Sequence, residues 1–319
     1  MQMLLVQLEY ELKRFQVQKN SIETVFIGGG TPSTVAPELY VPLFELLSPL
    51  LQADAEITSE ANPNSATVEW LEGMKQLGVN RISFGVQSFN KEKLKLLNRA
   101  HTPEMAQEAL LNAAKVGFTN LSLDIIYATL GDTKELLEYD LATAFSLPIN
   151  HISAYALTIE EGTAFASRPQ ISSEQLELTQ WLFERIKKEG FEQYEISNFG
   201  SYRSQHNLGY WQYKDYIGLG AGAVGKQGQT RFYPTPNIEE YIANPLKIDA
   251  EALTLQDQHI EKILLGLRSS VGVQNRLLSD EEKIKASILL QENKLYVKND
   301  TFYNSDYLLA DEIALYLTS

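Results

Sequence analysis

A run of glycines followed by Thr31 and Pro32 is the first segment whose residue types suit ligand binding. It comes directly after the apolar stretch 23–27, and because glycine has no Cβ, a ligand can approach the backbone of 28–30 closely. No lysine followed by serine or threonine comes next, and the glycines lack the GxGxxG spacing, so the run is not a typical phosphate-binding loop. A tight turn without a ligand is the alternative interpretation.

Two acidic residues and a glutamine, at or near the ends of apolar runs, could orient a polar ligand. Glu60 can accept hydrogen bonds from an ammonium group or a ribose hydroxyl, unless it is a helix cap or a surface acid. Asp124 lies within the apolar run 121–127, where a carboxylate needs a partner or a ligand to offset its desolvation. The Gln87 side chain carries both a donor and an acceptor, which suits a neutral polar ligand.

Arg99 and His206 are further candidates, each with a structural alternative. Arg99 follows a predicted helix, where an arginine is usually a solvated charge or a partner for the helix dipole. His206 begins the segment 206–211, and a lone histidine is more often structural than a ligand. The small residues of 218–223 follow, which is consistent with a loop that closes against a ligand or another element.

Composition narrows the class of protein and of partner. With 44% apolar and 21% charged residues, 319 residues can form one large α/β domain, alone or with a small appendage. The net charge of −14 disfavours nucleic acid as a partner. With no cysteine and only four scattered histidines, we expect neither disulfides nor a thiolate or zinc site.

The sequence also bears on localisation. No apolar run is long enough for a membrane span, and 1–14 resembles an amphipathic helix more than a signal peptide. We therefore predict a cytoplasmic protein.

Strand-like and helix-like segments alternate along most of the chain. Short apolar or β-branched runs predict strands at 23–27, 55–60, 81–86, 121–127, 151–157 and 194–197. Amphipathic patterns predict helices at 37–51, 65–77, 91–98, 103–116, 133–147 and 173–189. This alternation indicates a parallel sheet with crossover helices, whose ligand site lies at the carboxyl ends of the strands.

The last third of the chain differs in character. A proline-rich stretch leads to predicted helices at 256–268, 279–291 and 307–317, with a hairpin formed by 294–297 and 301–303. This order indicates a small winged-helix-like appendage. It lacks a dense basic helix, so a packing or partner domain is favoured over DNA binding. We therefore predict a barrel domain at 1–200, a connecting segment at 201–250 and the appendage at 251–319.

In their order along roughly 20–225, these segments resemble radical-SAM proteins of the oxygen-independent coproporphyrinogen oxidase and haem chaperone family. The segments that carry the resemblance are 28–32, 59–63, 84–90, 97–99, 122–127 and 194–199. The resemblance implies a partial (β/α) barrel that binds S-adenosylmethionine across its strand ends. It also implies a reduced [4Fe–4S] cluster, which in the family cleaves that molecule to methionine and a 5′-deoxyadenosyl radical.

Carried over residue by residue, the resemblance also implies a binding site for one or two S-adenosylmethionine molecules. Its residues would be Gly29, Gly30, Thr31, Glu60, Gln87, Arg99, Asp124 and Val224. The glycine turn would meet the methionine end, the carboxylates would hold ammonium and ribose groups, and Arg99 would pair with a carboxylate. The segment 206–211 resembles the HNxxYW sequence of the haem chaperone branch, which favours haem binding and delivery to an acceptor protein, with His206 as the candidate haem contact.

The chain also departs from the family pattern. Family members carry a first strand and a CxxxCxxC loop upstream of the helix in which this chain begins, so we expect a barrel without its first strand. About 35 to 40 residues would then be missing, enough for a strand, a loop and part of a helix. Without cysteine the chain is not expected to start a radical reaction. Residues 127–132 depart from the usual loop sequence as well.

Three functions are therefore compared. The first is a haem chaperone-like protein whose cluster loop is absent from this sequence. The second is oxygen-independent coproporphyrinogen III oxidase activity, motivated by the shared barrel motifs. The third is a cluster-free protein that keeps only a binding or interaction role.

Overall fold

The chain forms two compact units in the computed structural model, which describes residues 1–159, 165–173 and 175–319. One unit, here called the barrel unit, comprises 24–41 and 55–203. The other, the terminal unit, comprises 1–23, 42–54 and 204–319.

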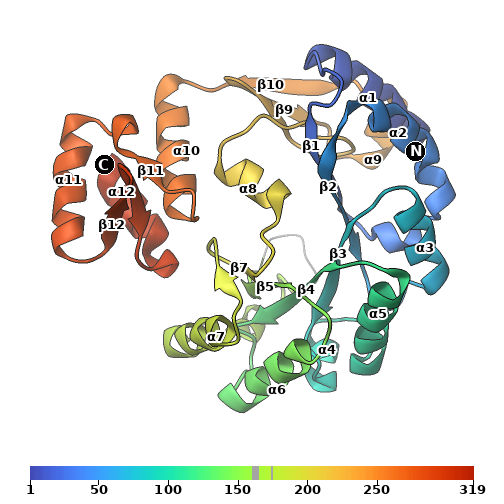
Figure 1. Ribbon diagram of the computed structural model, residues 1–319, viewed down its shortest axis with the longest axis horizontal. Coiled ribbons are helices and arrows are strands. Elements are labelled where there is room, and N and C mark those ends of the chain that lie inside the picture. The colour runs from blue at the N-terminus through green and yellow to red at the C-terminus, as the bar shows by residue number, and fades with distance from the viewer. Residues whose placement is uncertain (160–164, 174) are drawn as a thin grey trace. The chain divides into compact units, whose positions relative to one another are not determined.

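A mixed seven-stranded sheet organises the barrel unit, which confirms the predicted α/β class (Figure 1). Its strands are β1 (Ile22–Ile27), β2 (Leu51–Ala61), β3 (Arg81–Gln87), β4 (Asn120–Tyr127), β5 (His151–Ala156), β6 (Glu192–Gln193) and β7 (Asn198–Gly200), in the order β1-β2-β3-β4-β5-β7-β6. The pairs β2–β3, β3–β4 and β4–β5 are parallel, so their carboxyl ends lie at one edge. β7 pairs antiparallel with β5 and with β6.

Helices cover one face of this sheet, as Figure 1 shows. They are α3 (Val68–Gln76), α4 (Lys91–Leu96), α5 (Pro103–Val116), α6 (Lys134–Phe145) and α7 (Leu176–Lys188). Along β3 the fully buried Ile82, Phe84 and Val86 alternate with Ser83, Gly85 and Gln87, because successive strand residues point to opposite faces. Ser83, Gly85 and Gln87 therefore face away from the helices.

Two predicted elements are wrong. Residues 194–197 are not a strand but the link between β6 and β7. In this link Tyr194 is fully buried, and its hydroxyl hydrogen-bonds Nε2 of His151 at 2.8 Å. The helix predicted at 37–51 is broken into the turn Pro37–Tyr40, α2 (Val41–Leu47) and the turn Ser48–Leu50, after which β2 begins. Proline near both ends of α2 removes backbone donors and limits the helix to a short piece.

The other predicted helices and strands of this unit differ only at their ends. The helix predicted at 65–77 begins at Val68, and the one predicted at 173–189 spans 176–188, with residue 174 outside the described residues. Strand β2 begins four residues earlier than predicted, at Leu51.

A buried ion pair fastens α4 to the loop before α6. Nζ of Lys93 lies 2.7 Å from Oδ1 of Asp132, and the two side chains are only 2% and 1% exposed. Lys93→Met should lower the free energy of unfolding by about 3 to 5 kcal/mol, because it leaves a buried carboxylate without its partner. Urea unfolding measures this value. The control is Lys95→Met on the same helix, whose ion pair with Glu92 is exposed, and for which we expect a change below about 0.5 kcal/mol.

The terminal unit contains two three-stranded sheets, the second of which lies in the C-terminal region 255–319, here called the C-terminal domain. The helix expected at 1–14 is present as α1 (Gln2–Arg14). Sequence analysis missed α8 (Gln205–Trp211), β8 (Gly225–Gln227), β9 (Thr230–Pro234), α9 (Ile238–Ala243), β10 (Ile248–Ala252) and β11 (Val273–Gln274). The predicted C-terminal elements are confirmed as α10 (Leu255–Leu267), α11 (Asp280–Gln291), β12 (Leu295–Lys298), β13 (Thr301–Asn304) and α12 (Ala310–Thr318), around a shared apolar core.

The small-residue loop 218–223 is held by a side chain from α1. The fully buried Gln7 accepts hydrogen bonds from the Gly220 amide and the Tyr241 hydroxyl, and donates one to the Gly218 carbonyl. A Cβ on Gly218 would lie 2.2 Å from the carbonyl oxygen of Val224, so only glycine fits there. This loop therefore closes against another element of its own unit.

Within the described part of the chain, no helix has the length and apolarity that crossing a membrane requires.

Candidate functional site

A polar cavity of about 200 Å³ lies at the carboxyl ends of the barrel strands. Its lining comes from the turn after β1, the ends of β2 and β3, the middle of β4 and the segment after α4: Gly30, Thr31, Pro32, Glu60, Ala61, Asn62, Ser83, Gly85, Gln87, Arg99 and Asp124. The structure thus brings together most residues that the sequence singled out. Their contact with a ligand stays a prediction.

The glycine turn at this cavity has a backbone that favours glycine. Gly29 and Gly30 have φ values of 73° and 58°, in the left-handed region that L side chains rarely adopt. The amide of Gly29 donates to Oε2 of Glu60 at 3.2 Å, and a Cβ on Gly28 would lie 2.7 Å from the Phe26 ring. The segment is a tight turn, and it is also one wall of the cavity.

Two carboxyl groups and one guanidinium set the charge of the cavity. Burial raises the pKa of Glu60, although the Gly29 amide opposes the shift. Burial also raises the pKa of Asp124 to about 6, and the charge of Glu60 adds to this, while Ser153, Arg81 and Arg99 act in the other direction. Burial lowers the pKa of Arg99, and Asp124 counteracts it. Two acids and one base suit a ligand that carries both cationic groups and a carboxylate.

Gln87 enters the cavity from an irregular end of β3. The pairing of β3 with β4 shifts register between Phe84 and Gln87, and Gln87 has φ 71°. A Cβ on Gly85 would lie 3.1 Å from Nε2 of Gln87 and 3.3 Å from Oδ1 of Asn62. Glycine at position 85 therefore leaves space for both amide side chains.

Sequence analysis missed the contributions of Asn62, Gly85 and Ser153. Asn62 and Gly85 each stand two residues from a predicted site residue, and the two-residue period of a strand could have placed them on the same face. Ser153 lies opposite Asp124 in the β4–β5 pair and hydrogen-bonds it. The pairing of β4 with β5 was needed to find it.

Val224 lies in the terminal unit, so its membership of this cavity stays a prediction, and His206, the candidate haem contact, lies in the terminal unit as well. His206 is on α8, whose first turn is capped by the Ser204 hydroxyl. Its Nε2 hydrogen-bonds the Tyr210 hydroxyl at 3.1 Å, and the two rings meet edge to face. Tyr210 in turn packs edge to face on Tyr216.

The other histidines have structural partners, as expected. His151 is fully buried between the hydroxyls of Ser122 and Tyr194, and burial lowers its pKa well below the usual value. His259 pairs with Glu282 in the C-terminal domain. Among the residues that the structure describes, no group of three or more histidines, aspartates and glutamates could hold a metal ion.

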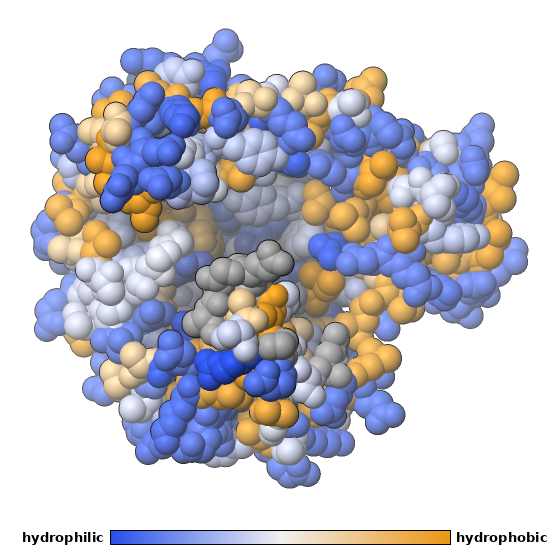
Figure 2. Space-filling view, turned by 180° about the vertical axis from the view of Figure 1, so that it is seen from behind, coloured by the Kyte–Doolittle hydropathy of each residue, from blue (hydrophilic) through white to orange (hydrophobic). Residues whose placement is uncertain are grey.

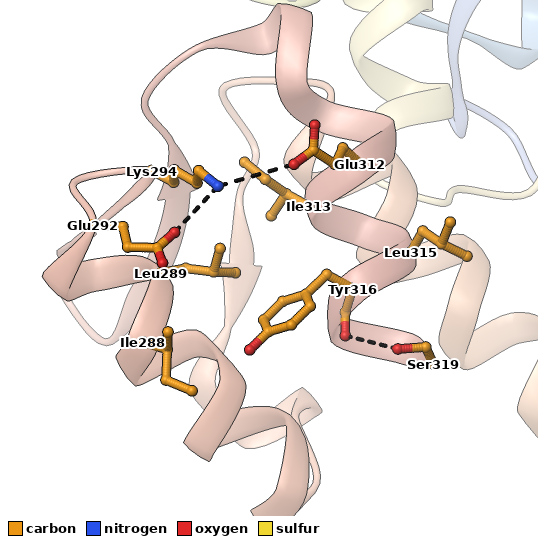
Figure 3. A pocket seen from close by; sticks show the side chains of 9 residues that line it. All are labelled: Ile288, Leu289, Glu292, Lys294, Glu312, Ile313, Leu315, Tyr316 and Ser319. Atoms are coloured by element: carbon orange, nitrogen blue, oxygen red, sulfur yellow. Dashed lines mark hydrogen bonds and ion pairs between the residues drawn. The ribbon is translucent and has the colours of Figure 1, made fainter.

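A second cavity, of about 490 Å³, lies between α11 and α12 in the C-terminal domain (Figure 3). Leu289 and Tyr316 point into it, and Lys294 bridges Glu292 and Glu312 at one end. The same domain exposes Ile284, Ile288, Tyr296, Val297, Leu315 and Tyr316, and Figure 2 shows apolar areas on its surface. Apolar side chains form much of this cavity, with charged residues at one end, so it differs in chemistry from the polar barrel cavity.

Comparisons with known proteins agree on one superfamily. Residues 2–143 match the model of the radical SAM superfamily. The heme chaperone HemW of Lactococcus lactis is 32% identical over 323 residues, which cover 97% of this chain and 83% of that protein. HemW of Bacillus subtilis is 33% identical over 278 residues, 82% of this chain and 73% of that protein.

Among solved structures, the coproporphyrinogen III oxidase HemN of Escherichia coli is similar with a TM-score of 0.76. The likeness covers 93% of this chain and 78% of that one at 21% sequence identity, so it concerns the fold alone. It confirms the predicted partial (β/α) barrel.

Proposed function

The chain belongs to the HemW family of the radical SAM superfamily, and from this premise we propose that it is a haem chaperone that binds haem and S-adenosylmethionine. The observation that carries the proposal is the 32% identity to a relative named heme chaperone over 97% of the chain. Delivery of haem to an acceptor protein is part of the proposal.

The chemistry of the barrel cavity supports S-adenosylmethionine as one ligand. This molecule carries an ammonium, a sulfonium, a carboxylate and a ribose. Glu60 and Asp124 offer acceptors and negative charge for the cationic groups and the ribose, while Arg99 offers donors for the carboxylate. The residues present therefore fit this ligand.

The side chains of α8 support haem as the other ligand. Imidazole and phenol both bind haem iron in proteins, and His206 and Tyr210 place one of each at 3.1 Å from each other. We assign His206 as the haem contact. Its Nε2 is hydrogen-bonded to Tyr210, so iron binding at that atom requires the Tyr210 hydroxyl to move away.

The residues of this sequence do not fit a [4Fe–4S] cluster. A cluster iron requires thiolates, and the 319 residues contain no cysteine. The fold likeness to a coproporphyrinogen III oxidase, at 21% identity, does not favour that activity for this chain either.

Titration of the purified chain with haem and with S-adenosylmethionine tests the proposal. Absorption spectroscopy follows haem, and calorimetry follows S-adenosylmethionine. We expect haem and S-adenosylmethionine each to bind saturably, with at least one site for each ligand. Failure to bind haem would reject the chaperone function, and failure to bind S-adenosylmethionine would reject the assignment of the barrel cavity.

A further inference from the structure

The backbone at Gln87 is a strained turn that aims the side chain into the barrel cavity. The amide of Ser88 donates to the Val86 carbonyl at 2.9 Å, across the single residue Gln87 with φ 71°. A γ-turn with positive φ at its central residue is rare and strained, and the cost is greater for a residue with a Cβ. Such a turn persists only where neighbouring groups hold it.

One group that holds the turn is the carboxylate of Asp140 on α6. It accepts hydrogen bonds from the Ser88 hydroxyl at 2.7 and 3.0 Å and from the Phe89 amide at 2.6 Å. Asp140 is fully buried, and it does not line the cavity. The carboxylate therefore fixes the backbone immediately after Gln87 from the helix side of the sheet.

A second group, His101, holds the other side of the turn. Nε2 of His101 lies 2.9 Å from the Val86 carbonyl oxygen, and because a carbonyl only accepts, the imidazole donates. His101 is 5% exposed and stands two residues after Arg99. It therefore links the backbone before Gln87 to the segment that carries another residue of the cavity.

We propose that Asp140 and His101 are positioning residues that hold Gln87 in its left-handed turn and so determine the affinity of the barrel cavity for its ligand. They act without touching the ligand. The inference rests on the proposed binding of S-adenosylmethionine. Asp140 offers the sharper test because, among the described residues, its hydrogen bonds reach Ser88 and Phe89 alone, although its charge also interacts with that of the buried Lys93.

A double-mutant cycle between Asp140→Asn and Gln87→Gly tests the mechanism. Asp140→Asn should weaken S-adenosylmethionine binding roughly tenfold, because the turn loses a charged acceptor and relaxes. Glycine at position 87 removes the side chain but adopts positive φ freely. In the Gln87→Gly background, Asp140→Asn should therefore change the dissociation constant less than about twofold. Calorimetry measures the dissociation constant of S-adenosylmethionine for the parent, the two single variants and the double variant. Ser88→Ala, combined with Gln87→Gly in the same way, removes a hydrogen bond to Asp140 without altering a buried charge.

Hydrogen exchange of the free protein gives a readout that needs no ligand. Exchange of the amides in 86–90 should accelerate in Asp140→Asn before any global loss of structure. The matched control is Asn150→Ala, which removes a side chain that hydrogen-bonds the backbone of Thr119 and Leu121 at the amino end of β4. It should cost stability without weakening binding.

Each result decides a different point. If the parent protein does not bind S-adenosylmethionine, the proposed ligand is wrong, and the exchange experiment alone decides whether Asp140 holds the turn. The inference is overturned if the parent binds and Asp140→Asn binds equally well. It is also overturned if Asp140→Asn weakens binding by the same factor with glycine at position 87, or if exchange in 86–90 is unchanged.

Discussion

Asp124→Asn is expected to stabilise the free protein at neutral pH while it removes most of its affinity for S-adenosylmethionine. The pKa of Asp124 is about 6 in the folded chain, against an ordinary value of 3.8. The folded state thus binds this proton more tightly than the unfolded state. Below pH 3.8 the group is protonated in both states and costs nothing, whereas above pH 6 its ionisation opposes folding in full.

The expected size follows from that shift. A difference of this magnitude corresponds to at most about 3 kcal/mol. This net value already contains the opposing effects of Ser153 and Arg99, so the gain from asparagine should be on the order of 1 to 3 kcal/mol. Urea unfolding should show this gain at pH 7.5 and almost none near pH 4. Equal stability of the two proteins at both pH values would contradict the prediction.

Ligand binding should change in the opposite direction. Loss of one charge-assisted contact should raise the dissociation constant of S-adenosylmethionine about 10- to 100-fold at pH 7.5. In the parent protein the affinity should fall roughly tenfold between pH 7 and pH 5 as Asp124 is protonated, and this dependence should be absent in Asp124→Asn. Calorimetry at both pH values measures it. The control is Glu108→Gln on the exposed face of α5, which removes one negative charge outside the cavity.

His206→Ala is the second substitution with a large expected effect, and haem binding is its readout. Loss of an iron-binding imidazole should abolish the absorption bands of the bound haem or weaken binding at least about tenfold. Tyr210→Phe should act in the opposite direction. It removes the hydroxyl that occupies Nε2 of His206, so haem affinity should rise about two- to tenfold, the value of one ordinary hydrogen bond.

The pair of variants separates two ligand assignments. If Tyr210→Phe loses haem and His206→Ala keeps it, the phenol rather than the imidazole binds the iron. His259→Ala is the matched control, since it removes a histidine of the same unit that is paired with Glu282. It should leave haem binding unchanged.

Much of the barrel unit could be predicted from sequence because its strands β2 to β5 are parallel and buried on the helix side. Runs such as 121–127 are apolar enough to identify a strand, and the crossover helices have clear start signals. The site residues Glu60 and Gln87 could be found because strand ends gather at one edge. The alternating residues 194–197 gave a wrong strand prediction, because the burial of Tyr194 is compatible with a link as well as with a strand.

The antiparallel parts and the supporting contacts could not be predicted in the same way. Strands β8, β9 and β10 are short, and their residues are mostly half-buried or exposed, so they lack a strong apolar signal. Asp140 stands in an ordinary helix, and only the tertiary structure places it beneath Ser88, 52 positions earlier. The residues that line the cavity cluster near strand ends, whereas the residues that hold them can come from any element.

The bond between Gln7 and the loop at Gly218 also has a consequence for synthesis of the chain. The two residues are 211 positions apart, and the terminal unit is assembled from three separate stretches of sequence. At ordinary translation rates, α1 would wait about 10 to 40 s for its partner loop to leave the ribosome. The barrel unit, contained between these stretches, can fold in that interval, while the apolar face of α1 stays open to chaperones and to aggregation until the last third of the chain arrives.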